Sequence, residues 1–210
     1  MKEILIVSGK GGAGKTSLAA CFAGLAHHAV LVDCDVDASD LPLLLHPEVL
    51  EEHWFSSGVI PAINRERCTC CGRCIDLCRF HAIAPGSDGQ AELRSGACEG
   101  CGVCADHCPA GAIALAERHC GRWMRSRTVF GTMFHAELLP GAENSGKLIS
   151  AIRAAARREA EKQHCDYLLS DGPPGIGCPV ISAATGIDFA VAVTEPTVSG
   201  IHDLKRLMVL

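Results

Sequence analysis

Residues 9–16 read GKGGAGKT, directly after the apolar run 4–7 and before an Ala- and Leu-rich stretch at 16–26. The stretch satisfies the phosphate-binding pattern G-x4-G-K-[ST], which requires a strand before it and a helix after it. Its glycines allow backbone N–H groups to close on phosphate oxygens, and the N-terminus of the following helix adds its positive end. The stretch therefore predicts an α/β domain that binds a nucleotide.

The pattern also predicts what individual residues of the loop do. Lys15 is expected to reach the β- and γ-phosphates, and the Thr16 hydroxyl is expected to bind Mg²⁺. A glycine turn without a ligand is the alternative, and the strand–loop–helix context disfavours it. The expected nucleotide contacts are Gly9, Lys10, Gly11, Gly12, Ala13, Gly14, Lys15, Thr16 and Ser17.

The composition limits the kind of protein further. The chain has 210 residues, of which 48% are apolar and only 4% aromatic, and its net charge is −5. This balance suits an α/β core of aliphatic residues and gives no sign of a surface for nucleic acid. We expect no membrane span and no secretory leader, and hence a cytoplasmic protein with reduced thiols. Its fourteen cysteines are then better interpreted as metal ligands than as disulfides.

The texture of the chain changes twice along its length. Apolar runs predict strands at 29–32, 167–170 and 189–193, a strand or hairpin at 128–138, and helices at 146–163 and from 200 onward. Residues 64–120 hold ten of the fourteen cysteines. We therefore expect an α/β domain at 1–58 and 121–210, with a doubly wound, mostly parallel sheet, interrupted by a cysteine-rich domain at 59–120. Because the last helix has no return strand, the C-terminal part of the sheet is expected to be missing.

The helix expected at 146–163 carries a basic face. A charged face of this kind is usually solvated, and we expect the same here. Its basic residues are Lys147, Arg153, Arg157, Arg158 and Lys162.

The cysteine-rich part is an internal repeat with an offset of 30 residues, covering 59–88 and 89–118. CTCCGRCIDLCRFHAI (68–83) and CEGCGVCADHCPAGAI (98–113) each contain C-x2-C-x2-C-x3-C. Zinc sites usually use two cysteine pairs separated by a longer loop, so this spacing favours iron–sulfur clusters over zinc. Cys70 aligns with Gly100 and is not expected to be a ligand. Arg79 follows Cys78 where the second half has a proline.

The repeat resembles the two-cluster bacterial ferredoxins, in which the fourth cysteine of each run binds the other cluster. The resemblance implies two [4Fe–4S] clusters. One ligand set would be Cys68, Cys71, Cys74 and Cys108, and the other would be Cys98, Cys101, Cys104 and Cys78.

The second lysine of the loop, Lys10, narrows the class of nucleotide site. The form K-G-G-x-G-K-T resembles the deviant Walker A loop of the Mrp/MinD/ParA ATPases, a group that includes the nitrogenase iron protein and the cobyrinic acid a,c-diamide synthases. The resemblance implies a homodimer in which Lys10 reaches the nucleotide of the partner subunit and stabilises the transferring phosphate. A solvated lysine is the alternative.

Acidic residues follow two of the expected strands. The same resemblance implies a first switch at Asp33 and Asp35 and a second switch in DGPPG, which begins at Asp171. Asp35 would position the attacking water. Asp33 is either another carboxylate of the first switch or a structural residue. Asp171 would hold a water on Mg²⁺, and the Gly175 N–H would approach the γ-phosphate.

The chain is most similar to one subfamily, the MinD-superfamily ATPases with an inserted ferredoxin domain. Besides the loop and the cysteine repeat, the resemblance rests on NSGKL (144–148), DGPPGIGCPVIS (171–182) and VTEPTVSGIHDLKR (193–206). It implies ATP hydrolysis coupled to electron transfer toward a redox partner, without nucleic acid or membrane. An Mrp-type ATPase for iron–sulfur assembly or transport is the alternative. Cys178 either joins a bridging cluster or is a small packing residue.

Overall fold

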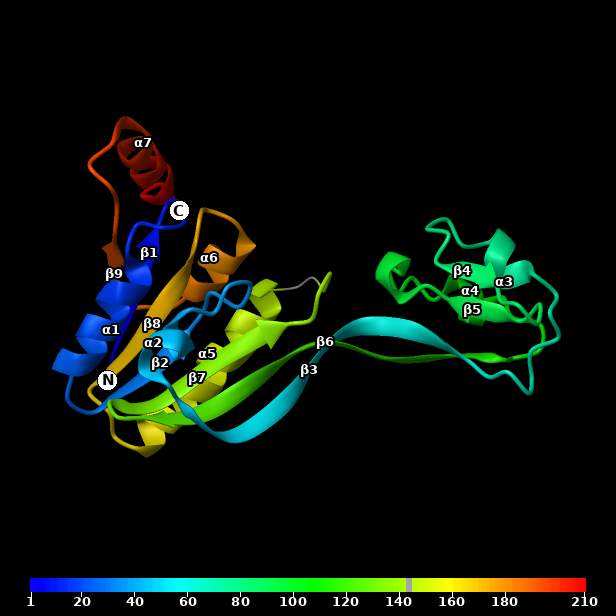
Figure 1. Cartoon of the computed structure of the whole chain (residues 1–210), viewed down its shortest axis with the longest axis horizontal. Helices are drawn as coiled ribbons and strands as arrows, with labels where there is room; N and C mark the ends of the chain where they lie inside the picture. The colour runs from blue at the N-terminus through cyan, green and yellow to red at the C-terminus, as the bar shows by residue number, and fades with distance from the viewer. Residues whose placement is uncertain (143–144) are drawn as a thin grey trace. The chain divides into compact units, whose positions relative to one another are not determined.

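The computed structural model describes residues 1–142 and 145–210, so Asn144 of the NSGKL stretch lies outside the described residues. The described chain divides into two compact units (Figure 1). The larger one comprises Met1–Phe55 and Gly121–Leu210, and the smaller one comprises Ser56–Cys120.

A seven-stranded sheet forms the centre of the larger unit, in the order β3-β6-β7-β2-β8-β1-β9. Its inner strands run parallel to one another, whereas β6 runs antiparallel to β7. The prediction of an α/β fold with a mostly parallel sheet is therefore confirmed. The strand bounds are β1 Lys2–Ser8, β2 Ala29–Asp33, β3 Glu48–Ile63, β6 Ile113–Thr128, β7 Gly131–Leu138, β8 Tyr167–Pro174 and β9 Phe189–Ala192.

Helices cover both faces of this sheet because the strands bury both sides. Helices α5 (Ser145–Lys162) and α6 (Cys178–Ala184) pack on one face, and α1 (Lys15–Leu25) and α2 (Leu41–Leu45) pack on the other (Figure 1). Along β1, Leu5 and Val7 face the first pair of helices, while Ile6 faces the second pair. The continuous apolar run thus contributes side chains to the hydrophobic cores on both faces of the sheet, as expected for a parallel strand that is buried on both faces.

Strands β3 and β6 depart from the sequence-based expectation. Each is 16 residues long and passes from one unit into the other along the chain. Most of β3 is exposed, so it has no apolar alternation that could have revealed it. The hairpin expected at 128–138 exists, but its turn falls at 129–130 and β7 alone fills the remainder.

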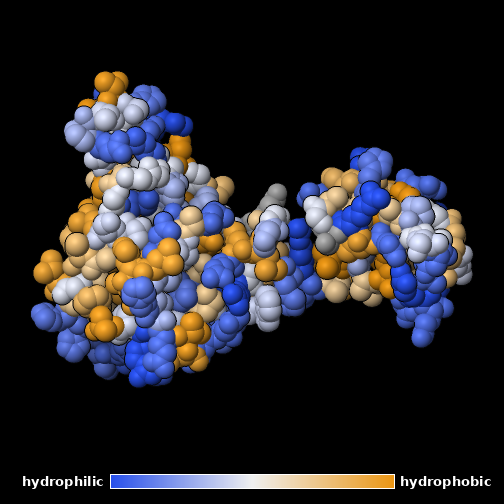
Figure 2. All heavy atoms as spheres, viewed as in Figure 1, coloured by the Kyte–Doolittle hydropathy of each residue, from blue (hydrophilic) through white to orange (hydrophobic). Residues whose placement is uncertain are grey.

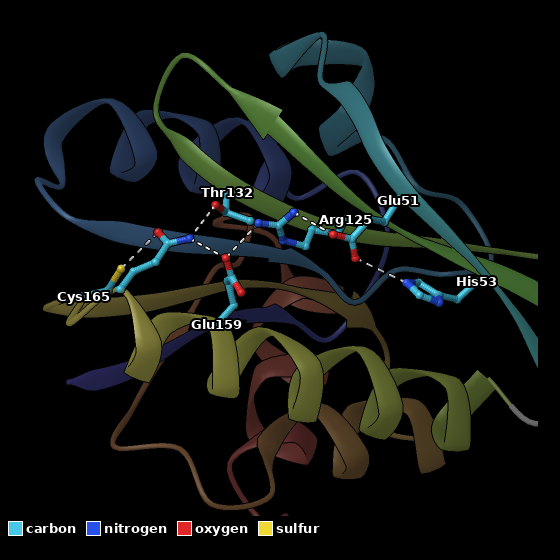
Figure 3. A network of polar contacts seen from close by, with 7 residues as sticks. Glu51, His53, Arg125, Thr132, Glu159 and Cys165 are labelled. Carbon is cyan, nitrogen blue, oxygen red and sulfur yellow. Dashed lines mark hydrogen bonds and ion pairs between the residues drawn. The ribbon is translucent and has the colours of Figure 1, made fainter.

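A polar network links α5 to the antiparallel side of the sheet. Arg125 on β6 donates to Glu159 on α5 at 2.9 Å and to Glu51 on β3 at 3.0 Å. The Arg125 and Glu159 side chains are only 24% and 13% exposed, so this pair is partly shielded from solvent. Figure 3 shows the further members of the network, which are Thr132, Gln163, Cys165 and His53.

The smaller unit reproduces the sequence repeat in its backbone. Its short helices α3 (Arg73–Asp76) and α4 (Val103–Asp106) each begin after a glycine with positive φ, at 74° for Gly72 and 80° for Gly102. The equivalent residues Cys70 and Gly100 also share a left-handed backbone, at 56° and 68°. The remaining elements are β4 Ile83–Pro85, β5 Ala91–Leu93 and a 3-10 helix at Ser95–Ala97.

The surface of the larger unit mixes polar and apolar residues. On the face shown in Figure 2, hydrophobic atoms occur in small groups between hydrophilic ones. Isolated apolar groups of this kind are normal on a protein surface. Among the described residues, no helix has both the length and the apolar character needed to cross a bilayer.

Candidate nucleotide-binding site and cysteine cavities

The glycine loop connects the end of β1 to the start of α1, as its pattern predicts. Gly12 and Gly14 have φ angles of 80° and 91°, a region that side chains rarely adopt. A Cβ atom placed on Gly11, Gly12 or Gly14 would meet no atom within 4 Å, so this side of the loop is open. The loop therefore leaves room for a ligand to approach its backbone.

Lys15 stands at the first position of α1 and is buried, with 6% of its surface exposed. The charge of Lys15 lowers the pKa values of Asp35 and Asp171, although burial raises both more strongly. A buried ammonium at a helix N-terminus, among carboxylates, adds positive charge where phosphate would bind.

Two of the carboxylates lie on neighbouring strands. Asp33 ends β2 and is paired in register with Asp171 on β8. Burial, and then the charge of Asp171, raise the pKa of Asp33 to about 7. Burial raises the pKa of Asp171 to about 6, against the opposing effects of Thr16 and Lys15. The site thus brings together carboxylates whose negative charge is only partly balanced by nearby positive groups and hydrogen-bond donors of the protein.

The two acidic residues after β2 differ in their surroundings. Asp33 accepts hydrogen bonds from the Asp35 N–H at 3.0 Å, the Ser39 hydroxyl at 2.8 Å and the Leu41 N–H at 3.1 Å. Asp33 thereby holds the turn that leads into α2, which fits its structural interpretation. The Asp35 carboxylate has one backbone donor, the Ala38 N–H, and is half-buried beside Lys15. Its carboxylate is therefore the more available of the two.

Asp171 and Thr16 fit a magnesium ion. The Oδ1 atom of Asp171 is buried and has no hydrogen-bond partner among the described residues. Buried polar atoms normally have partners, so an orphaned carboxylate oxygen points to a missing cation or water. The Thr16 hydroxyl lies close enough to lower the pKa of Asp171. Hydroxyl and carboxylate oxygens are the ligands that Mg²⁺ prefers.

The N–H of Gly175, which is predicted to approach the γ-phosphate, is used in a hydrogen bond within the protein. It donates to the Ser8 carbonyl at 3.0 Å, which ties the loop after β8 to the end of β1. Gly175 has a φ of 94°. A contact between this N–H and a γ-phosphate requires the bond to Ser8 to break.

Lys10 has an acidic partner that the sequence did not reveal. Its ammonium forms an ion pair with Glu195 at 2.8 Å, and both side chains are about two-fifths exposed. Glu195 lies in the loop between β9 and α7 (Val198–Leu207). A Cβ on the neighbouring Gly9 would collide with Asp203 of α7. The front of the loop is therefore held against the α7 segment, 185 residues away in sequence.

The smaller unit contains two cavities lined by cysteines. Both are largely apolar, and each lies beside one of the short helices α3 and α4. The first cavity is lined by Cys68, Cys70, Cys71, Cys74 and Cys108, and the second by Cys78, Cys98, Cys101 and Cys104. Apart from Cys70, these are the two ligand sets that the ferredoxin resemblance implies.

Backbone amides point at several of these thiols. The Ala82 N–H donates to the Cys78 sulfur at 3.3 Å, and the equivalent Ala112 N–H donates to the Cys108 sulfur at 3.3 Å. No three His, Cys, Asp or Glu side chains converge on one point within the described part of the chain, as a single metal ion would need. A polynuclear cluster makes a different demand, because its thiolates bind separate iron atoms.

The fold and the loop geometry define this protein as an α/β phosphate-binding-loop protein with a nucleotide site at the carboxyl ends of its parallel strands. The sequence model of the CobQ/CobB/MinD/ParA nucleotide binding domain matches residues 4–206, and the chain belongs to this family.

Relatives of known sequence are consistent with this assignment. An uncharacterized protein of Methanocaldococcus jannaschii is 35% identical over 98% of this chain and 72% of its own length. The septum site-determining protein MinD of Bacillus subtilis is 35% identical over 34% of this chain and 27% of its own length. Among solved structures, MinD of Pyrococcus horikoshii complexed with Mg-ADP has 17% identity and a TM-score of 0.49. The alignment covers 99% of this chain and 63% of that one.

Proposed function

We propose that this protein is a MinD/ParA-type ATPase that couples ATP hydrolysis to electron transfer through two [4Fe–4S] clusters. One observation carries the proposal: eight cysteines of an internal repeat are divided between two cavities as two sets of four, each set drawing one thiol from the other half of the repeat. This crossed division is the ligand arrangement of two-cluster ferredoxins.

In the nucleotide half, each residue has a role that its position supports. Lys15 binds the β- and γ-phosphates, the Thr16 hydroxyl would bind Mg²⁺, and Asp171 would hold a water on that ion. Asp35 orients the attacking water, since its carboxylate is not occupied by the turn that engages Asp33. Lys10 acts on the nucleotide of the partner subunit in a homodimer, which requires it to leave Glu195.

In the cysteine half, the chain provides eight thiolates and a set of amide donors. The clusters, when bound, supply one-electron transfer. The apolar lining of each cavity limits the access of water. The amides of Ala82 and Ala112 stabilise the negative charge on two of the thiolate sulfurs. A redox protein of unidentified nature accepts the electrons.

Anaerobic reconstitution tests the proposal and separates it from an Mrp-type assembly role. The expected result is about eight irons per chain and, once the clusters are reduced with dithionite and the excess is removed, transfer of their electrons to an acceptor dye that depends on ATP. The clusters should stay bound when the protein is mixed with an apo-ferredoxin. Transfer of iron to the apo-protein would instead support cluster assembly or transport. Binding of only one or two zinc ions per chain would refute the cluster proposal.

A further inference from the structure

Helices α5 and α6 form an open surface groove with polar and apolar lining, which the proposed ATPase does not use. Two adjacent cavities of about 330 and 360 Å³ lie between these helices, and both are lined by Ser150 and Ser182. Their shared lining makes them one continuous groove, which we call the α5–α6 groove. Cavities of this volume accommodate small-molecule ligands.

The groove is positively charged. Within the part of the chain that the structure describes, no acidic residue lines it. Lys147 lines one end, and Arg153 and Arg157 line the other. The hydroxyls of Ser150 and Ser182 line both cavities, and Thr185 lies at the arginine end. The Ser150 and Thr185 hydroxyls already donate to the carbonyls of Gly146 and Ile181, which leaves Ser182 as the hydroxyl donor for a ligand. Ammonium, guanidinium and hydroxyl groups share one preference, which is for carboxylate or phosphate oxygens.

Arg153 contradicts the expectation that all basic residues of this helix are solvated. Its side chain is only 9% exposed, and it donates to the carbonyls of Ser182 and Thr185 at 2.9 Å each and to Glu3 at 2.8 Å. Its Nε atom is buried without a partner among the described residues. A buried cation with an unused donor is costly, so the wall of the groove is built around an incompletely satisfied positive group.

The other two cations are more exposed than Arg153, although Arg157 donates to the Gly186 carbonyl at 3.3 Å. Arg157 is 45% exposed, and it also contacts Glu3, which therefore offsets one of the two arginine charges. Lys147 is exposed and has no ion pair within the described residues. The groove consequently keeps a net positive charge after its internal pairing.

We propose that the α5–α6 groove binds a small anionic ligand through a carboxylate or phosphate group. Arg157 and Lys147 contact the anion at the two ends, Ser182 donates from the middle, and Arg153 positions the carbonyl-lined wall beneath them. The site is separate from the glycine loop, and it stands whether or not the cysteine cavities hold clusters.

Calorimetric titration with inorganic phosphate and, separately, with citrate tests this site at low ionic strength. Both Arg157→Gln and Lys147→Gln should weaken binding of the preferred probe about tenfold or more, because each removes a charge-assisted hydrogen bond. Arg158→Gln is the matched control, since this exposed residue lies on the same helix and does not line the groove. It should change the affinity less than twofold. The probe that binds more tightly identifies the ligand group.

One further control and the choice of two test variants make the outcome decisive. Lys15→Ala reports phosphate that binds at the glycine loop instead. Loss of binding only in that variant would overturn the proposal, as would the absence of millimolar binding by either probe, or equal weakening in Arg158→Gln. If Arg157→Gln unfolds because Glu3 loses a partner, Lys147→Gln still decides the question, since its side chain supports no internal contact among the described residues.

Discussion

Replacing Asp171 by asparagine tests the electrostatics of the proposed magnesium site. Burial raises the pKa of Asp171 from 3.8 to about 6, so the folded protein holds a proton that the unfolded chain releases. Stability contributed by this proton is fully present below pH 3.8 and is lost as pH rises through about 6. Above that range, the nucleotide-free protein carries the cost of a buried, partly compensated carboxylate.

The size of this cost follows from the shift. A difference of about two pKa units corresponds to roughly 3 kcal/mol, as an upper limit because Asp33 titrates beside it. Asp171→Asn should therefore raise the free energy of unfolding of the nucleotide-free protein at pH 8 by up to about 3 kcal/mol. At pH 4 the variant and the wild type should be nearly equal.

Urea denaturation at several pH values between 4 and 8 measures this effect. Asp37→Asn is the matched control, because Asp37 is exposed and follows β2, the strand that pairs with β8. Addition of Mg²⁺ and ADP should reverse the order at pH 8, since the ion favours the charged carboxylate of the wild type. An Asp171→Asn variant that is less stable than the wild type at pH 8 without nucleotide would refute this reasoning.

Four further substitutions have defined outcomes. Lys10→Ala should abolish ATP hydrolysis while leaving nucleotide affinity within a few-fold; equal loss of binding and hydrolysis would argue against a trans role. Glu195→Gln should tighten ATP-dependent dimerisation up to about fivefold in sedimentation experiments, because it frees Lys10 from a half-exposed ion pair. Arg125→Met should destabilise the fold by about 1 kcal/mol at pH 7. Burial raises the pKa of Glu159, but the hydrogen bonds from Arg125 and Gln163 and the charge of Arg125 outweigh burial and lower this pKa overall. In denaturation curves, the effect of Arg125→Met should therefore vanish as the pH falls through the lowered pKa of Glu159. Gly100→Ala should destabilise the smaller unit by about 2 kcal/mol in thermal unfolding, since its φ is 68° and its Cβ would strike the Val59 carbonyl; an unchanged melting curve would contradict this.

The parts of the fold that sequence predicts are those with a local physical cause. The run 4–7 and the glycines after it specify β1, the loop and the start of α1, because burial on both faces and positive φ angles leave a direct trace in residue type. Strand β3 leaves no such trace. Its residues are largely exposed, and its place in the sheet depends on pairing with β6, about 65 positions later in the chain.

The candidate site divides along the same line. Lys15, Thr16 and Asp171 follow from motif positions, whereas the contact between Lys10 and Glu195 joins residues with no local relationship in sequence. The burial of Arg153 was likewise hidden, because its helix pattern is that of an ordinary basic face. Only the register of α5 against α6 turns this side chain inward, toward carbonyl groups at the end of the second helix.

The Lys10–Glu195 pair links the front of the glycine loop, for which phosphate binding is proposed, to the segment that leads into α7. The Gly9 backbone lies against α7, so movement of Lys10 toward another subunit must disturb the loop that leads into this helix. The Gly175 N–H is bonded to the carbonyl of Ser8, which immediately precedes the same loop at the end of β1. Nucleotide binding in the proposed manner therefore breaks two contacts together, both on the N-terminal side of the loop, ahead of Lys15. Because each contact is individually weak, their joint loss can be offset by phosphate and Mg²⁺, and the loop can report nucleotide occupancy to both β8 and α7.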